Sequence, residues 1–174
     1  MNLSYPIGKF EAPETVSEEQ IQTWIREIEE VPALYEAAVR NLNQEQLDTP
    51  YRPEGWTVRQ VIHHVPDSHM NAYIRFHWTL TEDHPTIKAY NEADWAELPY
   101  LKEVPIQHSL DILKSVHARW VVLLKNLSVT DFERTYIHPQ YGRVFSLKTV
   151  LALYAWHGKH HLAHIENLKE RMGW

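Results

Sequence analysis

Histidine is the residue type in this chain whose number and spacing best fit a chemical role. The 174 residues include twelve histidines. Four of them lie near the C-terminus at positions i, i+3, i+4 and i+7, namely His157, His160, His161 and His164. At about 100° per residue, these positions share one face of an α-helix. Imidazole is a common metal ligand and exchanges protons near neutral pH, so this face predicts a metal or acid–base site.

The histidine face is expected to point into the protein, because it continues an apolar face that runs from Val150 to Leu168. Burying an imidazole without a partner costs about 1 to 3 kcal/mol, and a bound cation would supply that partner. His157 and His161 have the spacing of the helical two-histidine zinc motif, here without its adjacent Glu. An isolated pair could equally be hydrogen-bonded core or a solvated patch. Two further histidines on the same face favour the metal.

A third metal ligand must come from another helix, and the run VIHHVPDSH offers His63, His64 and His69. His69 is predicted to lie nearest the centre of that helix's buried stripe, His64 on its flank, and His63 almost opposite, facing solvent. Spacing alone leaves both His64 and His69 open as the third ligand. The stripe consists of Val58, Val61, Val65, Ala72 and Phe76.

Three histidine ligands predict a catalytic metal site rather than a structural one. Tetrahedral Zn²⁺ with three protein ligands keeps its fourth position open for water or substrate. Imidazole also suits Ni²⁺ and Cu²⁺, so the residue types do not select the metal. A di-iron site is disfavoured because neither histidine cluster contains the Glu-x-x-His motif of di-iron bundles. A fourth ligand, His160 or His164, would instead favour a structural metal.

Three other side chains near these histidines are candidates for a role in chemistry. Asp67 lies one helical turn after His64 and could orient a ligand or move a proton, although a solvated helix acid is the alternative. Arg75 could bind a substrate carboxylate through two parallel N–H···O bonds of its guanidinium, but a surface salt bridge is the favoured role. Tyr154 is predicted to be core.

The first two helices that would position these residues begin with clear capping signals. Ser17 with Gln20 starts a helix whose apolar face continues to Leu42, with Pro32 as a kink. Thr57 with Gln60 starts the second helix, which is expected to run to about residue 82 with a kink at Pro66.

The rest of the chain predicts a long connection and two more helices. Residues 83–104 hold no sustained period and are expected to form a crossover that lines one end of a bundle. A third helix covers 106–127, and 136–145 is a short hairpin or an ordered loop. The fourth helix begins after Ser146 and stops at Gly173. We therefore expect an all-α four-helix bundle in a single domain, 1–174.

Composition excludes several classes of protein. The formal net charge of −6 would repel nucleic acids. The chain has no run of about 18 apolar residues, no secretory signal and no cysteine, which predicts a cytoplasmic protein without disulfides or thiolate metal sites. Seven tryptophans are more than a small core readily hides, which weakly favours self-association.

The segments WTVRQVIHHVPDSHMNAYIRF and LYAWHGKHHLAHIENLKERMGW, together with the N-terminal NLSYPIG, resemble the DinB/YfiT family of metal-binding four-helix bundles. In that family a Trp-Ser/Thr pair precedes the first metal histidine by eight residues, and this resemblance selects His64. It places the other two ligands at His157 and His161. It also implies a cytoplasmic homodimer that binds zinc or nickel and acts as a metal-dependent hydrolase.

Two chemistries and one non-catalytic role follow from these inferences. A metal that activates water would make the protein a hydrolase. Because the wider superfamily includes enzymes that use small thiols such as bacillithiol, the resemblance also implies S-transfer from a thiol to an electrophile. The third possibility is a bundle whose metal only stabilises the fold.

Overall fold

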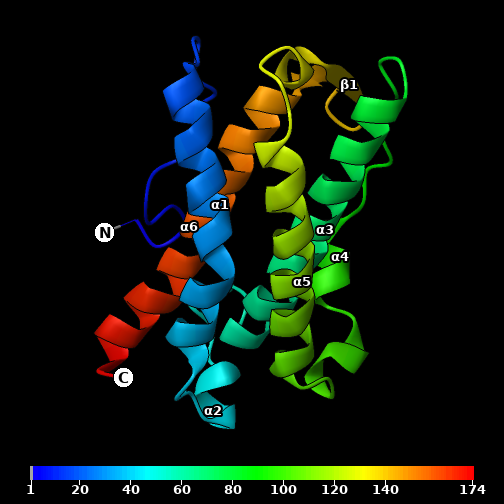
Figure 1. The fold of residues 1–174 in the computed structure, drawn as a ribbon. Helices are drawn as coiled ribbons and strands as arrows, with labels where there is room; N and C mark the ends of the chain where they lie inside the picture. Colours follow the sequence, from blue (N-terminus) through cyan, green and yellow to red (C-terminus); the bar gives the residue numbers. More distant parts are fainter. Residues whose placement is uncertain (1) are drawn as a thin grey trace.

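The computed structural model describes residues 2–174, and four long helices form the bundle in this part of the chain (Figure 1). They are α1 (Glu18–Val39), α3 (Val58–Thr81), α5 (Ile106–Lys125) and α6 (Leu147–Met172). The connections contain α2 (Gln44–Leu47), α4 (Glu92–Ala96), the 3-10 turns η1 (Pro99–Lys102) and η2 (Asp131–Glu133), and the strands β1 (Thr135–His138) and β2 (Arg143–Ser146).

The ends of the long helices follow the capping signals. Ser17, Thr57 and Ser146 each accept a hydrogen bond from a backbone N–H in the first helical turn. Gly173 ends α6 in the left-handed conformation (φ 71°), which glycine adopts without a steric penalty. The first helix is shorter than predicted, because it ends at Val39 rather than Leu42 and the chain turns into α2.

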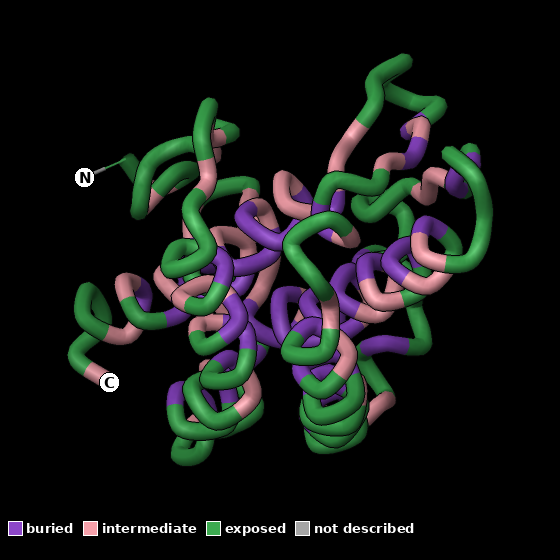
Figure 2. Tube along the Cα trace, turned by 45° about the horizontal axis from the view of Figure 1, so that its top comes forward, coloured by how far each residue is buried: buried purple, intermediate pink, exposed green. Residues whose placement is uncertain are grey.

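The helices pack in two neighbouring pairs, α1 with α6 and α3 with α5, and α1·α5 and α3·α6 contacts close the bundle. Figure 1 shows α1 and α5 in front of α6 and α3. Figure 2 shows the buried positions gathered on the sides of the helices that face one another. Both prolines predicted to kink the helices, Pro32 and Pro66, lie within unbroken helices.

A close approach of α1 to α6 depends on Gly158. A Cβ atom built at this position would lie 2.8 Å from Cγ2 of Val31, too close for an undisturbed contact. The Tyr35 hydroxyl donates a hydrogen bond to the Gly158 carbonyl at 2.8 Å. This contact fixes α1 next to the first histidine of α6, His157.

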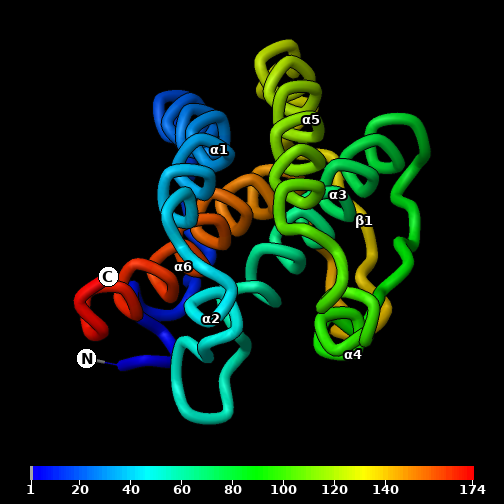
Figure 3. The backbone as a smooth tube through the Cα atoms, turned by 90° about the horizontal axis from the view of Figure 1, so that it is seen from below, coloured from blue at the N-terminus to red at the C-terminus, as the bar shows by residue number. Residues whose placement is uncertain are grey.

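The prediction that the segment between α3 and α5 lines one end of the bundle is wrong. Because α3 and α5 run in the same direction, the chain must return from the end of α3 to the opposite end of the bundle, and it does so along the side, beside α3 (Figure 1 and Figure 3). The β1–β2 hairpin lies on the same side of the bundle (Figure 3). The strands pair antiparallel from Thr135↔Ser146 to His138↔Arg143, so of the two predicted alternatives, hairpin and ordered loop, the segment forms the hairpin. A parallel bridge between Thr86 and Ile137 ties the crossover to it. The crossover is less irregular than predicted, because it contains α4 and η1. Among the described residues, the helices are all too short or too polar to cross a lipid bilayer.

Candidate metal centre

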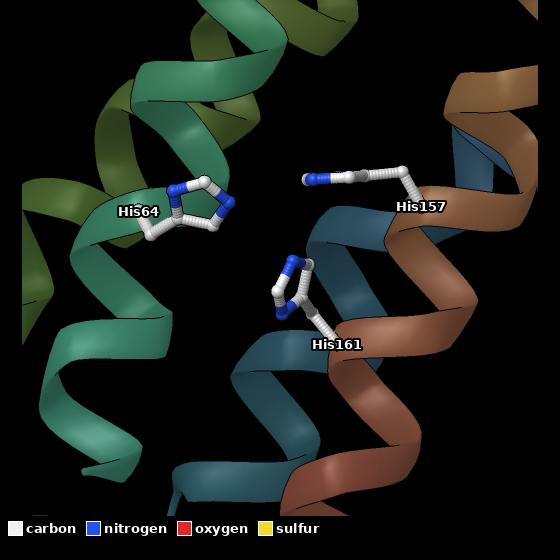
Figure 4. Close-up of side chains that lie close together, drawn as sticks. All are labelled: His64, His157 and His161. Carbon is white, nitrogen blue, oxygen red and sulfur yellow. The ribbon is translucent and has the colours of Figure 1, made fainter. Parts of the chain in front are cut away.

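Three histidines from two helices meet inside the bundle. His64 lies on α3, and His157 and His161 lie one turn apart on α6. One ring nitrogen from each lies within 4.8 Å of the others. Figure 4 shows the three rings turned toward one another across the space between the helices. The structure thus brings together the three residues that the family resemblance selected.

Burial keeps these imidazoles neutral. Loss of water lowers the pKa of His64 to about 4, and it lowers the pKa of His157 and His161 well below the usual range. The three rings also oppose one another's protonation, because like charges would lie close together. At neutral pH each ring therefore carries a free lone pair, which is the form that binds a metal.

A chain of hydrogen bonds determines which nitrogen His157 offers. His117 Nδ1 lies 2.7 Å from the Ile28 carbonyl oxygen, which can only accept, so His117 donates there. His117 Nε2 must then accept from His69 Nδ1 at 2.9 Å, and His69 Nε2 must accept from His157 Nδ1 at 3.1 Å. The Nε2 atom of His157 is left with its lone pair free for a metal.

This chain also defines the position of His69, the other candidate for the third ligand. His69 is fully buried, as its place at the centre of the stripe predicts. Both its ring nitrogens have imidazole partners, so it lies behind His157 and outside the group of three. The spacing of α3 could not separate His64 from His69, because both face α6.

The prediction that His63 faces solvent is wrong. Its side chain is 2% exposed, and its Nδ1 lies 2.7 Å from Ser109 Oγ. The reason is that α3 packs on α5 and η1 as well as on α6, so its far side is also covered. A helical wheel drawn for one buried stripe cannot show a second covered face.

His160 and His164 of α6 belong to a second group. His160 Nε2 lies 3.1 Å from His164 Nε2, and His161 is close enough to be shared between the two groups. Tyr51 stacks on His164 at a centroid distance of 3.9 Å, and Trp156 stacks on His160 at 4.4 Å. All four histidines of this helix point inward, as predicted, but His160 and His164 contact aromatic side chains away from His64.

The group of three lies on the wall of a cavity of about 290 Å³. This volume suits a small molecule. The crossover contributes Tyr90 and the hairpin contributes Tyr136 and His138. Sequence reasoning missed these residues, because they lie in irregular segments or short strands and only the fold brings them to α6. They make the far wall of the cavity largely aromatic.

Arg75 lines the same cavity, and the predicted surface salt bridge is wrong. The side chain is 7% exposed, and no acidic group among residues 2–174 lies within ion-pair distance. The far end of α3 is covered by the crossover, so a position that looks peripheral in the sequence is buried. Tyr154 is buried as predicted, and its hydroxyl lies 3.3 Å from Ser68 Oγ.

Asp67 lies apart from both histidine groups. The side chain is half-buried, and burial raises the pKa of its carboxyl to about 6. Within the described part of the chain, Asp67 is not among the residues that line the cavity. Its expected role in orienting a ligand or moving a proton stays a prediction.

The fold and the histidine site together define a class of protein. The sequence pattern of the DinB superfamily matches residues 27–165, and the chain belongs to this superfamily. Relatives from Bacillus cereus (strain B4264) and Bacillus anthracis (strain CDC 684 / NRRL 3495), both named "Putative metal-dependent hydrolase", are 54% identical over 173 residues. That alignment covers 99% of this chain and of each relative.

Solved structures agree with this assignment. YfiT from Bacillus subtilis, described as a probable metal-dependent hydrolase with an unusual four-helix bundle topology, superposes with a TM-score of 0.97 and 49% identity. The match covers 100% of this chain and 99% of YfiT. A mycothiol-dependent maleylpyruvate isomerase shares the fold at 16% identity, with a TM-score of 0.60 over 80% of this chain and 60% of that one. The predicted four-helix bundle is confirmed.

Proposed function

We propose that the chain is a metal-dependent enzyme of the hydrolase type, with one divalent ion held by His64, His157 and His161. The observation that carries this proposal is the meeting of three neutral imidazole nitrogens on the wall of a cavity. Zinc and nickel both suit three imidazole ligands. The relatives' shared name supports the hydrolase class.

The residues fit such an ion on their own chemistry. The hydrogen-bond chain from the Ile28 carbonyl leaves His157 Nε2 as an acceptor without a proton. Among the described residues, His161 Nδ1 is buried without a hydrogen-bond partner. A divalent ion bound by three neutral imidazoles keeps its full charge and lowers the pKa of water or a thiol that occupies its open position.

Hydrolysis also needs a base beside the attacking water. No acidic side chain in the described chain joins the three-histidine group. Asp67, with a pKa of about 6, is the nearest acidic residue along α3, and it would have to act through a solvent molecule or a moved side chain. Its role would be to accept a proton at its carboxylate.

The absence of an acidic side chain from the three-histidine group in the described residues favours a second candidate, the transfer of a small thiol to an electrophile. That reaction would not need a protein side chain as a base, because a bound metal would itself stabilise the thiolate form. The chain has no cysteine that would compete with an added thiol for the ion. The mycothiol-dependent isomerase shares the fold, and it makes a thiol such as bacillithiol or mycothiol a reasonable co-substrate to test.

The first experiment measures metal content after purification. Replacing His64, His157 or His161 by Ala should lower the content from about one ion per chain toward zero. His108→Ala, which changes an exposed histidine on α5, is the matched control and should keep the ion. Full metal retention in His64→Ala would contradict the proposed ligand set.

The second experiment separates the two reactions. Metal-loaded protein is incubated with esters, or with an epoxide or haloarene with and without bacillithiol. Conjugation that requires both metal and thiol would replace the hydrolase assignment with the transferase. If no substrate turns over while the ion stays bound, and a chelator unfolds the chain, the site is structural instead.

A further inference from the structure

Arg75 brings an uncompensated positive charge to the cavity wall. Its Nη2 donates a hydrogen bond to the Lys88 carbonyl at 3.3 Å, and its Cζ lies 6.0 Å from the centre of the Tyr90 ring. Its Nε is buried and has no hydrogen-bond partner among residues 2–174. A buried charge without a counter-charge is costly. The arrangement is therefore typical of a site where a ligand supplies the counter-charge.

Arg59, a second buried arginine on α3, lies outside the cavity and allows a comparison of polar partners with Arg75. It is 6% exposed, close to the 7% of Arg75. Its Nε donates to Asp48 Oδ1 at 2.7 Å, and its Nη2 donates to Gln44 Oε1 at 2.6 Å. Arg59 is neutralised by an acidic residue away from the cavity, whereas Arg75 has no such partner and lines the cavity.

The other charged group on the cavity wall is Glu92, an exposed residue at the start of α4. Its carboxylate is not within ion-pair distance of Arg75. The charge of Arg75 acts on the inner wall, where it opposes the rise that burial causes in the pKa of Tyr136 and Tyr154. The charge of Glu92 raises the pKa of Tyr154 in turn, but by less than Arg75 lowers it, so Arg75 is the stronger of the two charges at this wall.

We propose that Arg75 binds the carboxylate of an organic acid whose other end reaches the three histidines. That the other end of the acid reaches the three histidines rests on the proposed function. The carboxylate site at Arg75 does not depend on it. A guanidinium fits a planar carboxylate through two parallel N–H···O bonds. Among the described residues that line the cavity, Arg75 is the single Arg or Lys, which suits a monoanion better than a phosphate dianion.

The distance along α3 sets the shape of the ligand. Arg75 follows His64 by eleven residues, which is about 16 Å of helix. Helical side chains lean toward the N-terminus, so the guanidinium is expected to tilt back toward the histidines. The wall shared with them includes Phe145, Leu153 and Tyr154. The site therefore fits an elongated acid with an apolar or aromatic middle.

Calorimetric titration of the metal-loaded chain tests this site without any turnover. The probes are phenylacetate, phenylpropionate, phenylbutyrate and phenylvalerate, each compared with its uncharged primary amide. At least one acid should bind about tenfold tighter than its amide. Arg75→Gln should weaken that acid about 10- to 100-fold and change amide binding less than about twofold. Arg75→Lys should keep part of the preference, because it keeps the charge but not the fork.

Arg59→Gln is the matched control, since it removes a buried arginine from the same helix outside the cavity, and the preference for acids should survive it. Metal content and thermal melting are measured for each variant. The proposal is overturned if no acid outbinds its amide, or if the preference persists in Arg75→Gln, which would place the carboxylate on the metal. A failed hydrolase or transferase assay does not affect this result, because the experiment compares only the affinities of each acid and its amide.

Discussion

At the scale of single residues, the Ile28 carbonyl oxygen sets the protonation of three histidines in a row. It accepts from His117, which accepts from His69, which accepts from His157. Since a carbonyl cannot donate, the direction of every bond in the chain is determined. The Nε2 lone pair of His157 is therefore left free for the proposed metal ion.

Replacing His69 by Phe keeps a ring in the buried space and removes the acceptor for His157. The metal affinity should fall about 10- to 100-fold, although His64, His157 and His161 all remain. Competition with a chelator of known affinity measures the change, and His108→Phe on the exposed side of α5 serves as the control. An affinity within twofold of the parent chain would show that the hydrogen-bond chain does not support the site.

At the scale of helices, the α1–α6 contact is set by the absence of a side chain at Gly158. Substituting Ala would gain up to about 1 kcal/mol of helix propensity. The new Cβ would meet Cγ2 of Val31 at 2.8 Å, and Val31 is buried and branched, so it cannot easily move. Overpacking of this kind costs about 1 to 3 kcal/mol, and the net effect should be destabilising.

Urea denaturation of Gly158→Ala measures this cost. The double variant Gly158→Ala/Val31→Ala should lose less stability than the sum of the two single variants, because the second change removes the atom that clashes. If the loss in the double variant equals that sum, the clash with Val31 does not cause the effect of Gly158→Ala. Metal content should also fall in Gly158→Ala, since its neighbour His157 would shift with α6.

At the scale of the whole molecule, the buried histidines make stability depend on pH. Burial lowers the pKa of His64 and His117 to about 4, and it also lowers the pKa of His69, His157 and His161 well below the usual value. Below about pH 6.5 these histidines bind protons in the unfolded chain but not in the folded chain. The free energy of unfolding therefore decreases as the pH decreases. Each such histidine contributes a slope of up to about 1.4 kcal/mol per pH unit.

Denaturation of the chelator-treated chain at pH 7.5, 6.5 and 5.5 should show little change in the first interval and a clear loss in the second. Asp67 acts in the opposite direction, because its pKa is raised to about 6, but it is one group against several. Equal stability at all three pH values would contradict the buried neutral state of the histidines. The loaded protein should release its ion over the same range, since protons compete for the ligands.

We also propose that the chain forms a homodimer. Of its seven tryptophans, Trp120 is fully buried, whereas Trp78 and Trp95 are among the exposed large side chains. Aromatic side chains left on the surface are enriched at interfaces between proteins. Analytical ultracentrifugation at micromolar concentration should give twice the mass of the 20.6 kDa chain, and a clean monomer would exclude the dimer.

The sequence by itself determined the features that depend on near neighbours. Ser17, Thr57 and Ser146 start helices because each cap satisfies backbone groups within three residues. His157 and His161 share a face because four residues make about one helical turn. The four helices and the paired histidines of α6 could therefore be predicted from the order of the amino acids alone.

Only the tertiary structure decided what depends on the elements that cover each face. Periodicity could not choose between His64 and His69, and the fold placed His64 in the three-histidine group and His69 behind His157. It buried His63 under α5 and Arg75 beside the crossover, where the sequence predicted solvent. The burial and partners of a side chain are set by segments far away in the sequence, and no local pattern records which of them will lie against it.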